Sequence, residues 1–151
     1  FSSYLNLVRL GVPEEDISTI LMADHGLKLY GNAVIVNTDY AKNNSDMVKK
    51  FLVAIGAGWR DAIKDPKAAA AALVKRNPAA DAALEQRRLQ LAIDANVLTD
   101  YVKANGMGRV DSSRFAAAIE QLSETYEYKA APNAALYFTD EYLPASGISL
   151  N

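Results

Sequence analysis

Nine consecutive residues, Asp24 to Asn32, carry the side chains of this chain that are best suited to hold a small molecule. They include the only histidine, His25, next to the carboxylate of Asp24. A tyrosine ring can stack on a planar ligand while its hydroxyl forms a hydrogen bond, and an asparagine amide both donates and accepts. Gly31, between Tyr30 and Asn32, allows close approach of a ligand to the backbone. We predict ligand contacts at Tyr30, Gly31 and Asn32, with Asp24 and His25 next.

Binding is favoured over catalysis at this stretch. A lone histidine can act as a general base, but nothing near His25 supplies a nucleophile. A purely structural interpretation stays open for the same residues. His25 can form local hydrogen bonds within a loop, and Asn32 can bond to its own backbone in a turn that enters a strand.

Composition excludes several other classes of function. The chain has 151 residues, enough for one domain, and half of them are hydrophobic, which is typical of a globular protein. A net charge of -2 gives no electrostatic case for nucleic acid as a partner. The absence of cysteine removes disulfides and thiolate chemistry, and a single histidine argues against a zinc site. We expect neither a metal nor another cofactor.

The hydrophobic pattern predicts an α/β chain that is rich in helices. The β-branched and apolar runs at 17–22 and 33–36 are typical of strands, so we expect about two strands followed by a series of helices. A short helix at 4–10 would end at Gly11, and Thr38 would cap another. The remaining helices are expected at 46–64, from 66 onward, at 79–95, at 99–103 and after Asp111.

The most regular helical pattern, at 46–64, contains two features that need a reason. Gly56 and Gly58 each cost about 1 kcal/mol relative to alanine in a helix interior, which close packing would justify. Trp59 falls on the apolar stripe of this helix, so we expect it in the core and not in a cleft. The pairs Asp65-Pro66 and Asn77-Pro78 each combine a capping residue with proline, which predicts a helix start after both.

An ordered set of short motifs resembles a known family. The set comprises Leu29–Val36, Gly58-Trp59, Asp65-Pro66, Asn77-Pro78, Gly106-Met107-Gly108 ahead of Asp111, and Phe138–Pro144. Each motif alone is weak, but their order resembles the carboxy-terminal part of the solute-binding proteins of ABC importers for nitrate, taurine, alkanesulfonates and thiamine-precursor pyrimidines. The resemblance covers nearly the whole chain.

This resemblance implies a partial fold of the type II periplasmic-binding-protein kind. Such proteins have two lobes with the ligand between them, so residues 1–151 would be one unit, the carboxy-terminal half. Residues 1–30 would form the end of one lobe and the crossover, and 31–151 the helix-rich part of the other. The start at Phe1, with no initiating methionine, agrees with a fragment.

The resemblance also implies a function without a chemical step. The protein would capture a small polar or heteroaromatic ligand, such as a thiamine-precursor pyrimidine, a sulfonate or a nitrate-like anion. Hinge closure would enclose the ligand, and an ABC permease would receive it. The expected location is the bacterial periplasm, or the outside of a cell by a lipid anchor.

Two alternatives remain, together with an expectation for the fragment. A pyrimidine-synthase-like enzyme of thiamine biosynthesis resembles the same family, but it uses a cysteine-rich cluster that this chain lacks. A small helical interaction module is the other alternative. A fragment would expose apolar surface and strand edges where its missing half should pack, which favours a homodimer.

Overall fold

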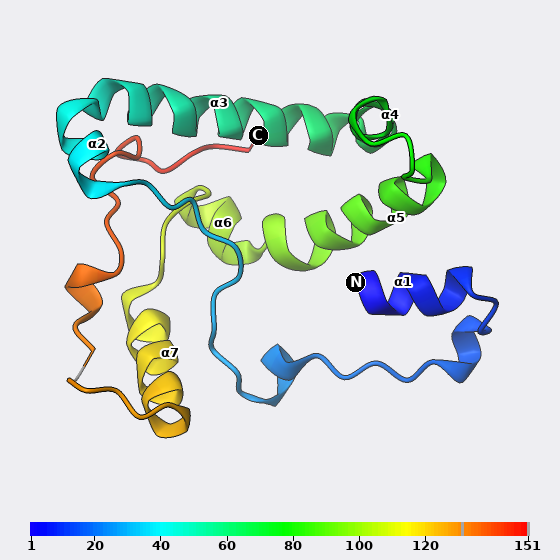
Figure 1. Cartoon of the computed structure of the whole chain (residues 1–151), viewed down its shortest axis with the longest axis horizontal. Helices are drawn as coiled ribbons and strands as arrows, with labels where there is room; N and C mark the ends of the chain where they lie inside the picture. The colour runs from blue at the N-terminus through cyan, green and yellow to red at the C-terminus, as the bar shows by residue number, and fades with distance from the viewer. Residues whose placement is uncertain (131, 151) are drawn as a thin grey trace.

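The computed structural model describes residues 1–130 and 132–150, and this part of the chain is helical with irregular connections (Figure 1). The helices are α1 (Ser2–Arg9), α2 (Thr38–Asn43), α3 (Ser45–Lys64), α4 (Pro66–Arg76), α5 (Ala82–Ala92), α6 (Asp100–Asn105) and α7 (Ser112–Thr125). Short 3₁₀ turns lie at η1 (Glu14–Asp16), η2 (Met22–His25) and η4 (Ala134–Leu136), and a π-helical turn, η3 (Ile93–Val97), continues α5.

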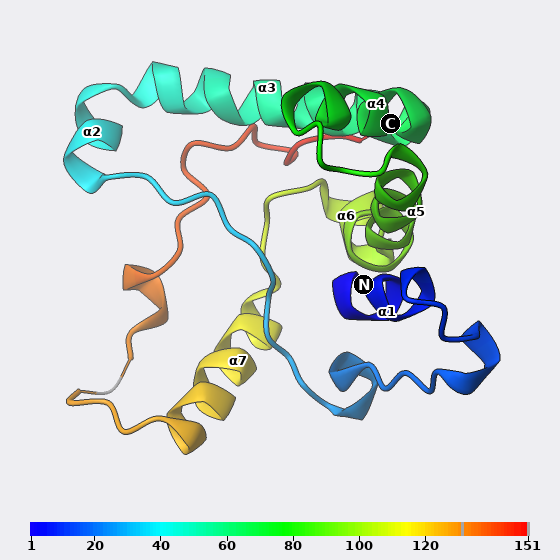
Figure 2. The same cartoon turned by 45° about the vertical axis from the view of Figure 1, so that its right-hand side comes forward.

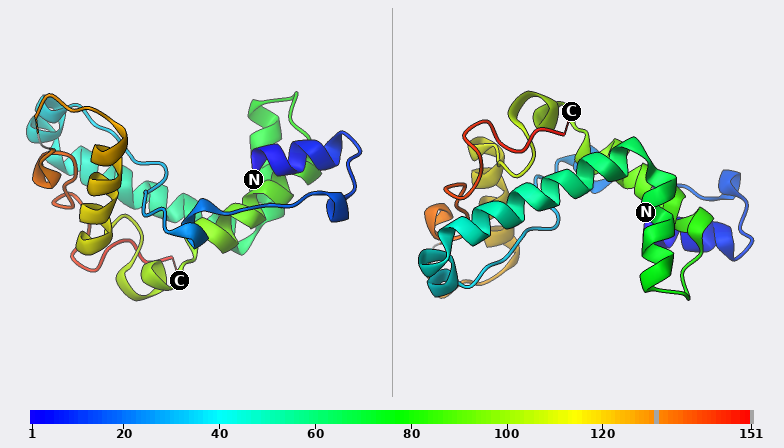
Figure 3. Two further views of the ribbon diagram at one scale, coloured as in Figure 1. Left: turned by 90° about the horizontal axis from the view of Figure 1, so that it is seen from below. Right: turned by 90° about the horizontal axis from the view of Figure 1, so that it is seen from above.

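The helices form an open frame around α3, the longest of them (Figures 1 and 2). Helix α4 follows at the end of α3, and α5 packs against α4 and returns below α3. Helix α1 lies against α5, while α7 descends on the other side of the molecule. The views from below and above show that the C-terminal segment runs close to α3 (Figure 3).

Helix starts follow local capping chemistry, and several agree with prediction. The Asp65 carboxylate accepts the Ala68 N–H at 2.9 Å and Pro66 opens α4, as expected. Helix α3 closely matches the predicted range 46–64, and α7 begins after Asp111. Gly11, with φ +89°, follows the end of α1 in a left-handed conformation.

Two predicted caps are wrong by a few residues. Asn37, not Thr38, caps α2, because its side chain accepts the Tyr40 N–H at 2.9 Å. Asn77-Pro78 forms a turn without starting a helix, and α5 begins only after Asp81, whose carboxylate accepts the Leu84 N–H at 2.7 Å. In both places a second Asn or Asp with the same capping ability lay within four residues of the predicted one.

The helix-rich character is confirmed, but the strands predicted at 17–22 and 33–36 do not form in the described part of the chain. Their apolar side chains remain in solvent: Ile20 is 67% exposed and Ile35 is 93% exposed. A strand gains its hydrogen bonds from a neighbouring strand, and none of the described residues supplies one to these runs. The α/β architecture is therefore not confirmed.

The buried core is small, and apolar side chains are widely exposed. The buried apolar residues of the described chain are Leu5, Ala41, Val48, Ala70, Ile93, Ala118 and Ile148. Large apolar side chains such as Leu10, Met22 and Phe51 are more than half exposed. The exposed apolar surface expected for a fragment is thus present on this chain.

The C-terminal segment is fastened beside α3 by close contacts and hydrogen bonds. Met107 and Ile148 exchange two backbone hydrogen bonds, of 2.8 and 3.1 Å, in an isolated antiparallel bridge. Arg60 of α3 donates to the Ser149 carbonyl oxygen at 2.9 Å. The Ile148 side chain packs so closely on α3 that a Cβ at Gly56 would lie 2.2 Å from its Cγ2. Close packing therefore explains Gly56 but not Gly58, which has open space around it.

A polar cluster joins α1, η1 and α5. The Glu14 carboxylate accepts hydrogen bonds from the Tyr4 hydroxyl and from Arg87, the latter at 2.5 Å. The Arg87 guanidinium also lies 5.8 Å from the centroid of the Tyr4 ring. Hydrogen bonds from Arg87 and Tyr4 lower the pKa of Glu14, and the hydrogen bond to Glu14 raises the pKa of Tyr4.

We expect acid to loosen α1 from α5. A carboxyl group with a lowered folded-state pKa contributes stability above its unfolded pKa of about 4.3, and this stability disappears as pH falls through the folded value. The protection factors of the α1 amides, in which the intrinsic pH dependence of hydrogen exchange is divided out, should therefore be constant near neutral pH and fall below about pH 4. Glu14→Gln should weaken this dependence, whereas Glu15→Gln, at the adjacent exposed acid, should retain it. An identical pH response in both variants would contradict the assignment.

Candidate functional site

The stretch that contains the predicted site lies along α7, about ninety positions later in the sequence (Figures 1 and 2). The Gln121 amide donates to the Gly26 carbonyl oxygen at 2.8 Å and accepts the Lys28 N–H at 2.9 Å. Arg114 donates from Nε to the Lys28 carbonyl oxygen and from a terminal nitrogen to that of Leu29, both at 3.0 Å. Four hydrogen bonds thus fasten the main chain of residues 26–29 to one helix.

Tyr30 is held at the end of this fastened segment. Its hydroxyl oxygen accepts the Asp111 N–H at 2.8 Å, at the start of α7. The Arg114 guanidinium carbon lies 4.6 Å from the centroid of the Tyr30 ring, within cation–π range. The Phe115 ring lies at 6.2 Å with a 57° tilt. Tyr30 remains 37% exposed, and its hydroxyl can still donate a hydrogen bond.

The surroundings of Tyr30 include a carboxylate that stays ionised. Hydrogen bonds from the Ser113 hydroxyl and from the Arg114 N–H lower the pKa of Asp111. Burial, followed by the nearby Tyr30 and Asp111, raises the pKa of Tyr101, so its phenol stays neutral at ordinary pH. The arrangement offers hydroxyl groups, an aromatic ring and charged groups of both signs, which suits binding of a polar ligand.

The other predicted site residues are exposed and do not gather around Tyr30. Asp24 and His25 belong to the 3₁₀ turn η2, which Gly26 ends with φ +94°. Within residues 1–130 and 132–150, no side-chain hydrogen bond involves Asp24, His25 or Asn32. A Cβ at Gly31 would meet no atom within 4 Å, so no described group requires a glycine there. The predicted residues therefore supply one positioned side chain, Tyr30, and three others, Asp24, His25 and Asn32, that have no side-chain hydrogen bond among the described residues.

The residues that sequence reasoning missed are Arg114 and Gln121. They are seven positions apart, which places them on the same side of a helix after two turns. This spacing is visible in the sequence, but it does not indicate which distant segment the two side chains contact. Only the three-dimensional structure pairs α7 with residues 26–30.

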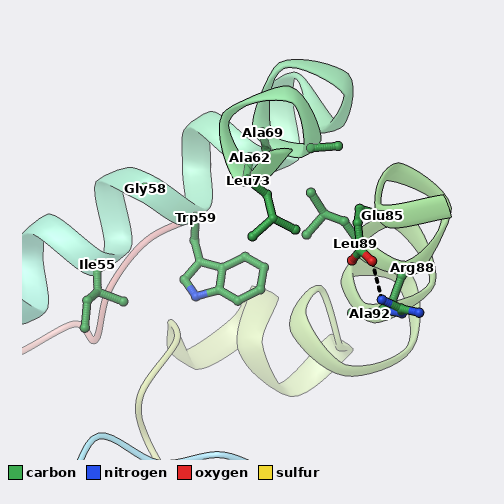
Figure 4. Close-up of a pocket in the computed structure, with 11 residues that line it drawn as sticks. Ile55, Gly58, Trp59, Ala62, Ala69, Leu73, Glu85, Arg88, Leu89 and Ala92 are labelled. Atoms are coloured by element: carbon green, nitrogen blue, oxygen red, sulfur yellow. Dashed lines mark hydrogen bonds and ion pairs between the residues drawn. The ribbon is translucent and has the colours of Figure 1, made fainter. Parts of the chain in front are cut away.

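A separate apolar cavity of about 480 Å³ lies between α3, α4 and α5 (Figure 4). Its lining includes Trp59, which is half-buried and faces the cavity, so the prediction that Trp59 belongs to the core and not to a cleft is wrong. An ion pair between Glu85 and Arg88 lies at the α5 side. The other lining residues are Ile55, Gly58, Ala62, Ala69, Ala70, Leu73, Leu89 and Ala92.

The described residues contain neither a metal-binding cluster nor a membrane-spanning helix. No group of three or more His, Asp or Glu side chains in the described part of the chain could hold a metal ion. No helix described here is long and apolar enough to cross a membrane.

Comparison with known proteins places the predicted site within a family match. Residues 3–69 match the model of the NMT1/THI5-like family. This match confirms the resemblance over these residues and is consistent with a fragment of the nitrate, taurine and thiamine-precursor binding family. No curated protein and no solved structure matches the chain. The motifs after residue 69, including Gly106–Gly108 and Phe138–Pro144, lie outside the matched segment.

Proposed function

We propose that this chain is part of a solute-binding protein that captures a small polar or heteroaromatic ligand for an ABC permease. The observation that carries the proposal is the NMT1/THI5-like match over residues 3–69, because it includes all five predicted contact residues. The ligand classes are those of the resembled proteins: thiamine-precursor pyrimidines, sulfonates and nitrate-like anions. The corresponding location is the bacterial periplasm or a lipid-anchored position outside the cell.

The geometry around Tyr30 supports a binding role. Its ring is fixed by contacts with α7 yet more than a third exposed, and its hydroxyl proton is available. Asn32, two residues on, presents an amide without a side-chain partner among the described residues. A rigid ring next to an adaptable amide matches the usual composition of small-molecule sites, in which a few polar groups orient the ligand. In the proposed mechanism, residues 1–30 and 31–151 belong to two lobes that close on the ligand by a hinge.

Removing either side chain should weaken binding in the natural full-length protein. We expect Tyr30→Ala and Asn32→Ala each to raise the Kd about fivefold, because each removes one stacking or hydrogen-bonding partner worth about 1 kcal/mol. Isothermal titration calorimetry with an aminopyrimidine, taurine, an alkanesulfonate and nitrate would identify the ligand and measure the effect. Tyr128→Ala is the control, since this exposed tyrosine pairs with Tyr126 beyond the end of α7. Unchanged affinity in both site variants would refute the site assignment.

The same family match supports a second candidate, a pyrimidine-forming enzyme. His25 is exposed in η2, and no described side chain forms a hydrogen bond with it, so it is available for chemistry. Incubation of the full-length protein with iron, followed by mass spectrometry for a pyrimidine product, separates the two candidates. A product that disappears in His25→Ala would favour the enzyme over the binding protein.

A further inference from the structure

We propose that Arg114 and Gln121 of α7 are positioning residues of the candidate ligand site. They fasten residues 26–29 to the helix and thereby hold the Tyr30 ring in one place. This inference rests on the proposed binding function, and it assigns a role in that function to a helix outside the matched segment 3–69.

The backbone of this segment has few partners of its own. Among the described residues, no backbone hydrogen bond involves the Lys28 N–H or the carbonyl oxygens of Gly26, Lys28 and Leu29. Their protein partners there are side chains of α7. Backbone polar groups need a partner, and water is the alternative here. The contacts with Arg114 and Gln121 therefore decide whether the segment rests on α7 or moves freely in solvent.

Gln121 uses both ends of its amide on the segment. One end donates to the Gly26 carbonyl oxygen and the other accepts from the Lys28 N–H, as a neighbouring peptide group would do. A methionine at this position has similar length but neither donates nor accepts comparably. Gln121→Met should therefore release the segment without removing the bulk of the side chain.

Arg114 connects the segment to the Tyr30 ring. Its guanidinium donates to two successive carbonyl oxygens and also lies 4.6 Å from the ring centroid. The Tyr30 hydroxyl is held separately by the Asp111 N–H. A lysine keeps the positive charge but not the planar fork that reaches two acceptors. A Tyr30 ring that is held in place before binding raises affinity, because the ligand does not have to order the site.

The first test needs no ligand. Among the described residues the Lys28 N–H donates its hydrogen bond to the Gln121 side-chain oxygen, so Gln121→Met should accelerate its hydrogen exchange about fivefold, the factor that corresponds to one typical hydrogen bond. Arg114→Lys should shift the NMR signals of the Tyr30 ring protons. Glu124→Ala, at an exposed α7 position without a hydrogen-bond partner among the described residues, is the control and should change neither. Unchanged Lys28 exchange and Tyr30 signals in the first two variants would overturn the inference.

The second test measures ligand affinity of the full-length protein with the ligand identified above. Gln121→Met and Arg114→Lys should each raise the Kd several-fold, although neither is assigned a contact with the ligand. Gln121→Glu retains an acceptor for the Lys28 N–H. Relative to Gln121→Met, it should therefore recover part of the protection of the Lys28 amide against hydrogen exchange. If Tyr30→Ala weakens binding but the two α7 variants do not, the positioning role is wrong and the proposed function stands. If Tyr30→Ala is also without effect, the site assignment itself fails.

Discussion

Replacement of Gly147 by alanine is expected to detach the C-terminal segment from α6 and α3. Gly147 has φ +71°, a left-handed conformation that costs other residues about 1–2 kcal/mol. A Cβ there would lie 2.5 Å from the Asn105 carbonyl oxygen and 3.1 Å from the Gly106 Cα. Both are backbone atoms and cannot rotate away, so overpacking should add about 1–3 kcal/mol. The combined penalty of about 2–5 kcal/mol falls directly on the two hydrogen bonds between Met107 and Ile148, which are next to Gly106 and Gly147.

Gly11 provides a matched control for this prediction. Its φ of +89° imposes a similar conformational cost on alanine, but a Cβ would meet no atom within 4 Å. Hydrogen exchange of the Met107 and Ile148 amides, which bond to each other's carbonyl oxygens, reports detachment directly. We expect rapid exchange of both amides in Gly147→Ala and wild-type exchange in Gly11→Ala. Equal protection in the two variants would show that the space at Gly147 is not limiting.

Alanine substitutions at two glycines of α3 that lie two residues apart, Gly56 and Gly58, are expected to change the free energy of unfolding in opposite directions. Gly56→Ala places a Cβ 2.2 Å from Cγ2 of the buried Ile148, a branched side chain with few alternative rotamers. Overpacking of about 1–3 kcal/mol should outweigh the gain of about 1 kcal/mol in helix propensity. Gly58→Ala meets nothing within 4 Å and should stabilise the helix by that gain.

Urea denaturation followed by circular dichroism should separate the two α3 variants by about 2 kcal/mol in the free energy of unfolding. The sign is as informative as the size, because helix propensity alone makes both substitutions stabilising. If both variants were stabilised equally, the packing of Ile148 on Gly56 would be refuted. Measured against Ile148→Ala alone, which lacks the clashing methyl group, the further change Gly56→Ala should give the propensity gain.

The helices that could be predicted from the sequence are those whose signals are local. Asp65-Pro66 and Asp111 each place a capping side chain within three residues of the amide that it binds, and both starts were predicted. The predicted strands fail for the opposite reason. The run at 17–22 has strand composition, but its hydrogen bonds depend on a partner strand, which the described residues do not contain.

The candidate site was predictable only in part. The stretch Asp24–Asn32 was recognisable by its side-chain chemistry, and its place within the NMT1/THI5-like match agrees with the resemblance. The contacts that hold Tyr30 come from Asp111, Arg114 and Phe115, whose roles depend on long-range folding. No local rule connects them with residues more than eighty positions earlier.

The fastening of residues 26–29 to α7 has a consequence for folding during synthesis. Its hydrogen bonds join residues 85 to 95 positions apart, whereas the Tyr4–Glu14 contact spans only 10. Chain elongation proceeds at about 5–20 residues per second, so the segment waits roughly 5–20 s for its helix to appear. We expect α3, α4 and α5 to pack during this interval, since their contacts lie close in sequence. The candidate site is thus among the last parts of this chain to assemble.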